Sequence, residues 1–163
     1  MKRILFLLPA LAALALVTCN SPGGAAGYSF PNQPLQGKIG GVSWTYVSGT
    51  ADSTVFAGKL WMELYDVSYM GPGPFAPGAY FGAGSTVLFT ISPVSVGLRP
   101  LAAGLGQQTV TLYDKPGTIN YVCMEGAVEI LTLDAVNGVM TGRMDAKFDA
   151  NNYVSGNFTA AYR

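Results

Sequence analysis

The clearest pattern in the chain is the alternation of apolar and polar residues in its C-terminal third, which predicts β-strands. Every second residue of 140–148 is apolar or glycine, and the residues between them are polar; the first set is Met140, Gly142, Met144, Ala146 and Phe148. The same alternation returns over 154–160. One face of these strands is therefore expected to lie in the core and the other in solvent.

Turn signals join these segments into a meander. Asn137-Gly138 predicts a two-residue type I′ hairpin turn, because both central residues of that turn need positive φ. Residues 150–152, Ala-Asn-Asn, predict a second turn. Three consecutive antiparallel strands are expected to run from residue 127 to the C-terminus.

Short apolar or β-branched runs separated by Gly, Pro, Asn and Asp continue upstream to Gly40. The strands predicted over the whole chain are 42–48, 55–67, 86–92, 109–113, 119–124, 127–134, 139–148 and 153–162, with 94–101 as an edge strand between two prolines. Nothing in 40–163 has a helical period or the composition of a linker. The pattern predicts one all-β domain, either an antiparallel β-sandwich or an up-and-down barrel of about eight strands.

The first 18 residues have the organisation of a signal peptide. Lys2 and Arg3 supply positive charge, and the 14 residues of 4–17 form an apolar run broken only by Pro9. This run is shorter than the roughly 20 residues that a membrane-spanning helix needs. Residues 1–18 are therefore predicted to be removed.

Leu16-Val17-Thr18-Cys19, at the end of this run, resembles the lipobox of bacterial lipoproteins. The resemblance implies that Cys19 is lipidated, with palmitate among the acyl chains, and becomes the first mature residue. Two or more acyl chains anchor a protein stably to a membrane. The expected location is the bacterial cell envelope, facing the periplasm or the cell surface. Secretion with an unmodified Cys19, or cleavage near 23–27, is the alternative.

Gly, Pro, Ser and Asn are frequent in 19–39, which is predicted to be a flexible tether, with 40–163 as the β-domain. The stretches 40–44 and 154–159 resemble those of small β-rich domains in uncharacterised bacterial lipoproteins, a resemblance that implies no activity. Gly41 and Trp44 also resemble the Gly-x-Trp opening of lipocalins, with one additional residue between them.

Composition narrows the possible chemistry. The 163 residues include no histidine and two cysteines, which argues against His-based acid–base catalysis, a Ser-His-Asp triad and most zinc sites. No cofactor is expected. Removal of 1–18 leaves seven basic and nine acidic side chains, a formal charge of −2. Because the bases are scattered along the chain, a nucleic-acid partner is not expected.

Other chemical motifs have simpler structural interpretations. Gly104-Leu105-Gly106 is expected to be a turn, and the oxygen-bearing side chains of 149–152 a hairpin turn rather than a calcium site. Glu125 and Glu129 are expected on a solvated face, although a carboxylate pair is what glycoside hydrolysis requires. Cys123 lies in an apolar run and is expected to be buried and unreactive.

Aromatic residues are the strongest candidates for contact with a partner. Trp61 and Tyr65 alternate with three aliphatic residues, so they are predicted on the polar face of a strand. Phe75 and Tyr80, in the Gly/Pro-rich stretch 70–84, are predicted to extend this surface. The alternative interpretation is that this stretch covers both aromatics.

The sequence therefore favours a non-enzymatic binding or scaffolding protein, with a protein or a small apolar ligand as its partner. A lipocalin-like carrier is the first alternative, with an interior lined by Met62, Met140, Met144 and Phe148. A hydrolase built on acidic residues is the second.

Overall fold

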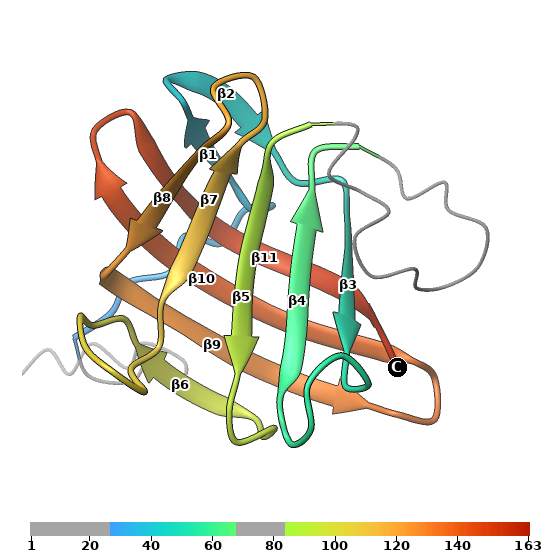
Figure 1. The fold of residues 1–163 in the computed structure, drawn as a ribbon. Coiled ribbons are helices and arrows are strands. Elements are labelled where there is room, and N and C mark those ends of the chain that lie inside the picture. The colour runs from blue at the N-terminus through green and yellow to red at the C-terminus, as the bar shows by residue number, and fades with distance from the viewer. Residues whose placement is uncertain (1–26, 68–83) are drawn as a thin grey trace, which may run out of the picture.

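Eleven β-strands and no helix make up residues 27–67 and 84–163, the ranges described by the computed structural model (Figure 1). The strands are β1 (Gln36–Ile39), β2 (Val42–Thr45), β3 (Ser48–Asp52), β4 (Leu60–Tyr65), β5 (Thr86–Ile91), β6 (Gly97–Pro100), β7 (Val110–Asp114), β8 (Ile119–Cys123), β9 (Glu125–Asp134), β10 (Val139–Asp149) and β11 (Asn152–Tyr162). The predicted all-β, single-domain fold is confirmed. Within the described ranges no helix is long and apolar enough to cross a membrane.

The strands form one curled sheet in the order β6-β9-β10-β11-β3-β4-β5-β7-β8. Strands β3, β4, β5, β7 and β8 form a front layer, and the long strands β9, β10 and β11 run behind it (Figure 1). All pairings between these strands are antiparallel except that of β11 with β3. Strand β6 pairs with β9 at one end of the order, in agreement with the edge position predicted for 94–101.

The core lies between the two layers and is built from alternate residues of each strand. Leu60, Met62 and Leu64 of β4 are fully buried there. Phe89 of β5 meets Phe158 of β11 edge to face, with 6.1 Å between ring centroids, which joins the front and back layers. The inward face predicted for 140–146 and 154–160 is confirmed, because Met140, Gly142, Met144, Ala146, Val154, Gly156, Phe158 and Ala160 are all buried.

Phe148 departs from this alternation. The pairing of β10 with β11 shifts register between Lys147 and Asp149, and an irregularity of this kind interrupts the period of two. Phe148 is consequently 50% exposed, and its ring packs against Tyr121 at 5.5 Å instead of entering the core. The prediction that Phe148 lines the interior is wrong.

The β9–β10 hairpin is present, but its turn differs from the prediction. Four residues, 135–138, separate the strands, and Gly138 has a φ of 64° whereas Asn137 does not have a positive φ. The Asp134 carboxylate accepts hydrogen bonds from the backbone N–H groups of Val136 and Asn137 at 3.0 and 2.9 Å. A side-chain cap therefore organises the turn, and the predicted two-residue type I′ turn is not formed.

The stretch expected to be a tether contains the first strand. Strand β1 pairs with both β2 and β11, and its last residue, Ile39, is buried, as is Leu35 just before it. Gly37 crosses β11 so closely that a Cβ at this position would lie 1.9 Å from the backbone oxygen of Tyr153. The folded sheet thus begins within the predicted tether, at Gln36.

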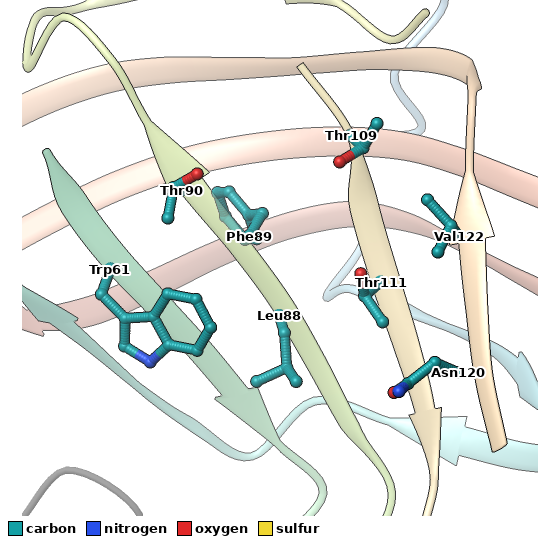
Figure 2. A pocket seen from close by; sticks show the side chains of 8 residues that line it. All are labelled: Trp61, Leu88, Phe89, Thr90, Thr109, Thr111, Asn120 and Val122. Carbon is teal, nitrogen blue, oxygen red and sulfur yellow. The ribbon is translucent and has the colours of Figure 1, made fainter. Parts of the chain in front are cut away.

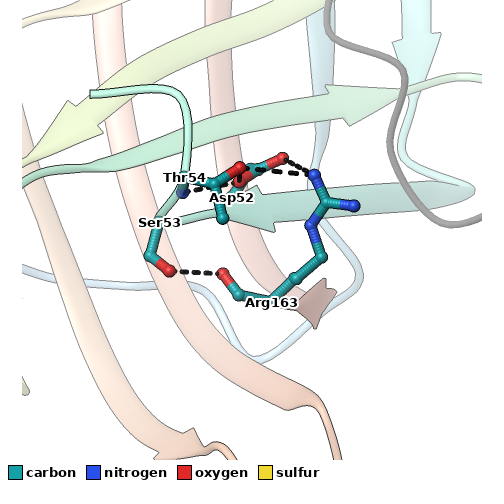
Figure 3. Close-up of polar contacts among 4 residues, drawn as sticks. All are labelled: Asp52, Ser53, Thr54 and Arg163. Atoms are coloured by element: carbon teal, nitrogen blue, oxygen red, sulfur yellow. Dashed lines mark hydrogen bonds and ion pairs between the residues drawn. The ribbon is translucent and has the colours of Figure 1, made fainter. Parts of the chain in front are cut away.

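The C-terminal end of β11 is fixed to β3 by several polar contacts (Figure 3). Arg163 donates from Nη2 to Asp52 Oδ2 at 2.9 Å, and its backbone oxygen accepts from both the N–H and the hydroxyl of Ser53. The Arg163 N–H donates to the Ala51 oxygen. These contacts hold the parallel pairing of β11 with β3, which connects the front layer to the back layer.

Candidate functional site

The outer face of the front layer carries the side chains that point away from the core. On β4 these are Trp61, Glu63 and Tyr65, as the alternation with Leu60, Met62 and Leu64 predicts. Trp61 is half-buried, but Tyr65 is only 3% exposed. Both aromatics therefore lie on the predicted face, and only Trp61 has the accessibility that a contact residue needs.

Glu63 joins the two aromatic residues. Trp61 donates from Nε1 to Glu63 Oε1 at 2.9 Å, and the Tyr65 hydroxyl donates to Glu63 Oε2. The Glu63 side chain is nearly buried, at 8% exposure. Because each carboxylate oxygen has its own donor, Glu63 fixes the orientation of the indole and satisfies the Tyr65 hydroxyl. Sequence reasoning assigned no role to Glu63, although a carboxylate two residues from each aromatic on one strand face is a readable signal.

A second contact restrains the Trp61 ring from the β3–β4 loop. Phe56 approaches it in a T-shaped arrangement, with 5.7 Å between centroids and 67° between planes. Aromatic pairs favour this geometry. The indole is therefore held on two sides before any ligand arrives.

Trp61 forms one wall of a groove of about 350 Å³ across β4, β5, β7 and β8 (Figure 2). Among the described residues no charged one lines this groove, and the lining residues are Trp61, Leu88, Phe89, Thr90, Thr109, Thr111, Asn120 and Val122. The strand register produces it, since Leu88 pairs with Thr111, which in turn pairs with Val122. The side chains thus alternate between apolar surface and hydroxyl or amide groups from one strand to the next.

A polar pocket of about 360 Å³ adjoins this groove and shares Thr90 with it. Its other lining residues are Lys59, Ser92, Arg99, Gly106, Gln107 and Gln108. All nine acidic side chains of the chain lie in the described ranges, and none of them lines this pocket. The pocket is consequently positive, next to a groove that is neutral.

Arg99 organises the turn beside this pocket. Its guanidinium donates to the backbone oxygens of Gly97, Pro93 and Ser95 and to the Ser95 hydroxyl, at 2.8 to 3.0 Å. Burial lowers the pKa of Arg99. Lys59, whose side chain is exposed, has no carboxylate within ion-pair distance among the described residues. Sequence reasoning did not bring Lys59 and Arg99 together, because they are 40 residues apart.

Glu125 and Glu129 lie on the outer face of the back layer, where each meets a base on β10. Glu129 Oε2 lies 2.6 Å from Arg143 Nε, and Glu125 Oε1 lies 3.7 Å from Lys147 Nζ. No register shift intervenes between these two pairs. The two glutamates therefore share a face, and each serves as an ion-pair partner across the strands. The predicted solvated face holds for Glu125, whereas the Glu129 side chain is only 15% exposed.

The thiol and the two turn motifs noted in the sequence all have structural roles. Cys123 is fully buried, and burial, with a smaller contribution from the Asp149 charge, raises its pKa to about 12, in agreement with the expected unreactive thiol. Asp149 accepts hydrogen bonds from the N–H of Asn151 and the amide of Asn152, which forms the predicted hairpin turn. Gly104 and Gly106 have positive φ in a turn, also as predicted.

Three of the candidate site residues, Cys19, Phe75 and Tyr80, lie outside the described residues. No group of three or more potential metal ligands occurs within 27–67 and 84–163. What the described site offers is a fixed aromatic ring, hydroxyl and amide groups, and an adjoining positive charge. Groups of these kinds can hold and orient a bound ligand.

In comparisons of its sequence and its fold with known proteins, the chain matches no family model, no curated protein and no solved structure.

Proposed function

We propose that this chain is a lipid-anchored cell-envelope protein that binds its ligand, without catalysis, in the groove beside Trp61. The lipid anchor is assigned to Cys19, on the sequence Leu16-Val17-Thr18-Cys19 and the apolar run before it. The anchored protein then presents its front layer to material of the envelope.

The fixed orientation of Trp61 is the observation that carries this proposal. Glu63 and Phe56 restrain an aromatic ring that is half-buried at the wall of a groove. A side chain ordered before binding loses less conformational entropy when the ligand arrives. The groove also lies on the sheet face opposite the core, so a ligand can enter it without displacing core side chains.

The partners of the acidic residues support a non-catalytic role over the hydrolase alternative. Glu63 receives two donors, and Glu129 is paired with Arg143. The packing of the interior similarly favours the outer groove over a lipocalin-like cavity. Met62, Met140 and Met144, which were expected to line such a cavity, are fully buried within the hydrophobic core.

Retention of envelope material by immobilised full-length protein tests the proposal. Trp61→Ala is expected to reduce retention at least about tenfold, because aromatic anchors contribute about 2 kcal/mol or more at binding sites. Phe148→Ala, which removes an aromatic ring of similar size on another surface, is the matched control and should retain the wild-type amount. Equal retention by wild type and a folded Trp61→Ala protein would refute binding at the groove.

A further inference from the structure

The groove and the positive pocket share Thr90 as a lining residue, and side by side they present three kinds of chemistry. The Trp61 ring is an apolar face. The threonines and Asn120 offer both donors and acceptors of hydrogen bonds. Lys59 and Arg99 add positive charge at the far end.

Building on the proposed groove function, we infer that the ligand is an acidic oligosaccharide, a chain of sugar rings that carries carboxylate groups. A sugar ring has apolar C–H faces and a rim of hydroxyl groups. Stacking one face on Trp61 leaves that rim directed at Thr111, Thr109 and Asn120, whose side chains can both donate and accept. An alkyl ligand would leave these polar groups without partners, which costs binding energy.

The charges on either side of Trp61 set the direction in which the ligand lies. Lys59 and Glu63 each stand two residues from Trp61, on opposite sides of it, a separation of roughly 6.6 Å along a strand. The Glu63 carboxylate repels an anionic group, and the Lys59 ammonium attracts one. The neutral part of the sugar therefore lies over Trp61 and Leu88, and its carboxylate lies in the pocket that contains Lys59.

Arg99 acts in this pocket through its charge. Because its guanidinium already donates to four acceptors of the 93–97 turn, it is held in place by the fold and adds to the positive potential. Lys59 is free to approach the ligand. In a cleft lined by charge of one sign, the local concentration of the opposite ion rises, and added salt screens the effect.

The volumes agree with a ligand of more than one ring. The groove and the pocket measure about 350 and 360 Å³, each within the range of about 300–1,000 Å³ typical of small-molecule sites. A single sugar occupies one of them. A carboxylate-bearing oligosaccharide engages both at once, so that its affinity exceeds that of its monosaccharide.

Titration of full-length protein in detergent with two matched sugars tests this inference. One is a four-residue oligouronate, and the other is the neutral oligosaccharide made by reducing its carboxyl groups. At low salt the oligouronate is expected to bind about fivefold more tightly, the upper end of the range for one exposed ion pair. The difference should shrink as salt is added. Equal affinities, or a difference that salt does not change, would overturn the acidic-sugar assignment.

Three variants locate the contacts. Lys59→Gln should reduce the preference for the oligouronate to the part that the charge of Arg99 supports, whereas Lys115→Gln, which removes the same charge from the β7–β8 turn, should preserve it in full. Thr111→Val should weaken both sugars while disturbing the sheet less than loss of Trp61 does. A preference as large in Lys59→Gln as in the wild type, or affinities unchanged in Thr111→Val, would contradict the inference.

Failure of this inference is distinguishable from failure of the proposed function. If neither sugar binds but retention of envelope material still depends on Trp61, the sugar assignment falls and the groove function stands. If retention does not depend on Trp61 either, both the sugar assignment and the proposed binding at the groove are refuted.

Discussion

Trp61 and Glu63 lie two residues apart on the outer face of β4, and the indole Nε1 of the first donates to Oε1 of the second at 2.9 Å. Residues at this spacing on a strand point to the same side, so the contact is local and follows from the strand itself. Tyr65, two residues further on, donates to the other carboxylate oxygen. One nearly buried carboxylate thus orders two aromatic side chains.

Replacement of Glu63 should therefore destabilise the fold. Glu63→Ala leaves the Trp61 N–H and the Tyr65 hydroxyl without this acceptor, and an unsatisfied buried polar group costs about 1–3 kcal/mol. Urea denaturation measures the loss. Glu125→Ala removes an exposed carboxylate and should change the free energy of unfolding by no more than about 0.5 kcal/mol. Equal effects of the two changes would contradict the role given to Glu63.

Phe158 and Phe148 should differ in their contribution to stability. Phe158 is 3% exposed and packs against Phe89, so Phe158→Ala should cost about 3–5 kcal/mol. Phe148 is half-exposed, and Phe148→Ala should cost about 1 kcal/mol. Chemical denaturation of the two variants checks the order, and a reversed order would mean that the register of β10 is wrong.

Asp52 should make stability depend on pH. Burial acts to raise its pKa, but hydrogen bonds from Thr54 and the charge of Arg163 together outweigh burial, so the pKa lies below its ordinary value of 3.8 (Figure 3). Ionised Asp52 therefore stabilises the folded protein above that value, and the stabilisation is lost as the pH falls through the lowered pKa.

The free energy of unfolding of wild type and Asp52→Asn should accordingly differ most near about pH 7 and converge towards about pH 2. Denaturation curves at several pH values measure this difference. A gap that stays constant with pH would show that Asp52 contributes through its shape and not through its charge.

Lipidation of Cys19 should be visible in the mature protein. The wild type should partition into the detergent phase, and mass spectrometry should find an acylated N-terminal cysteine. Cys19→Ala should move to the aqueous phase. In that variant Cys123 is the only thiol, and it should react with a thiol reagent only after unfolding, because it is fully buried and its pKa is raised. A wild type without acyl groups would refute the anchor.

Where alternation is strict and continuous, the sequence predicted which side chains face inward, as for Met140, Met144 and Phe158. It could not predict the exception at Phe148, because the register shift there arises from pairing with β11. The prediction of a type I′ turn at Asn137-Gly138 was wrong for a similar reason, since the Asp134 side chain supplies an alternative set of hydrogen bonds. The choice between such alternative pairings and turns depends on local geometry, which the residue pattern alone does not predict.

No short pattern in the sequence predicts the parallel pairing of β3 with β11 either. It joins Thr50 to Ala161, more than a hundred residues apart, and forms only when the whole sheet has curled. The same holds for the binding site. Alternation placed Trp61 on the outer face, but its groove depends on Thr111 and Val122 of strands that come next to β4 and β5 only in the folded sheet.

Acrylamide quenching of tryptophan fluorescence, with and without retained envelope material, tests the central claim most directly. Trp44 is buried and Trp61 is half-buried at the groove, so the emission lost in Trp61→Phe reports on the groove alone. This component should be quenched readily in the free protein and protected when the ligand is bound. A Trp61 component that acrylamide cannot reach in the free protein, or that the bound material does not protect, would contradict the assignment of the groove as the binding site.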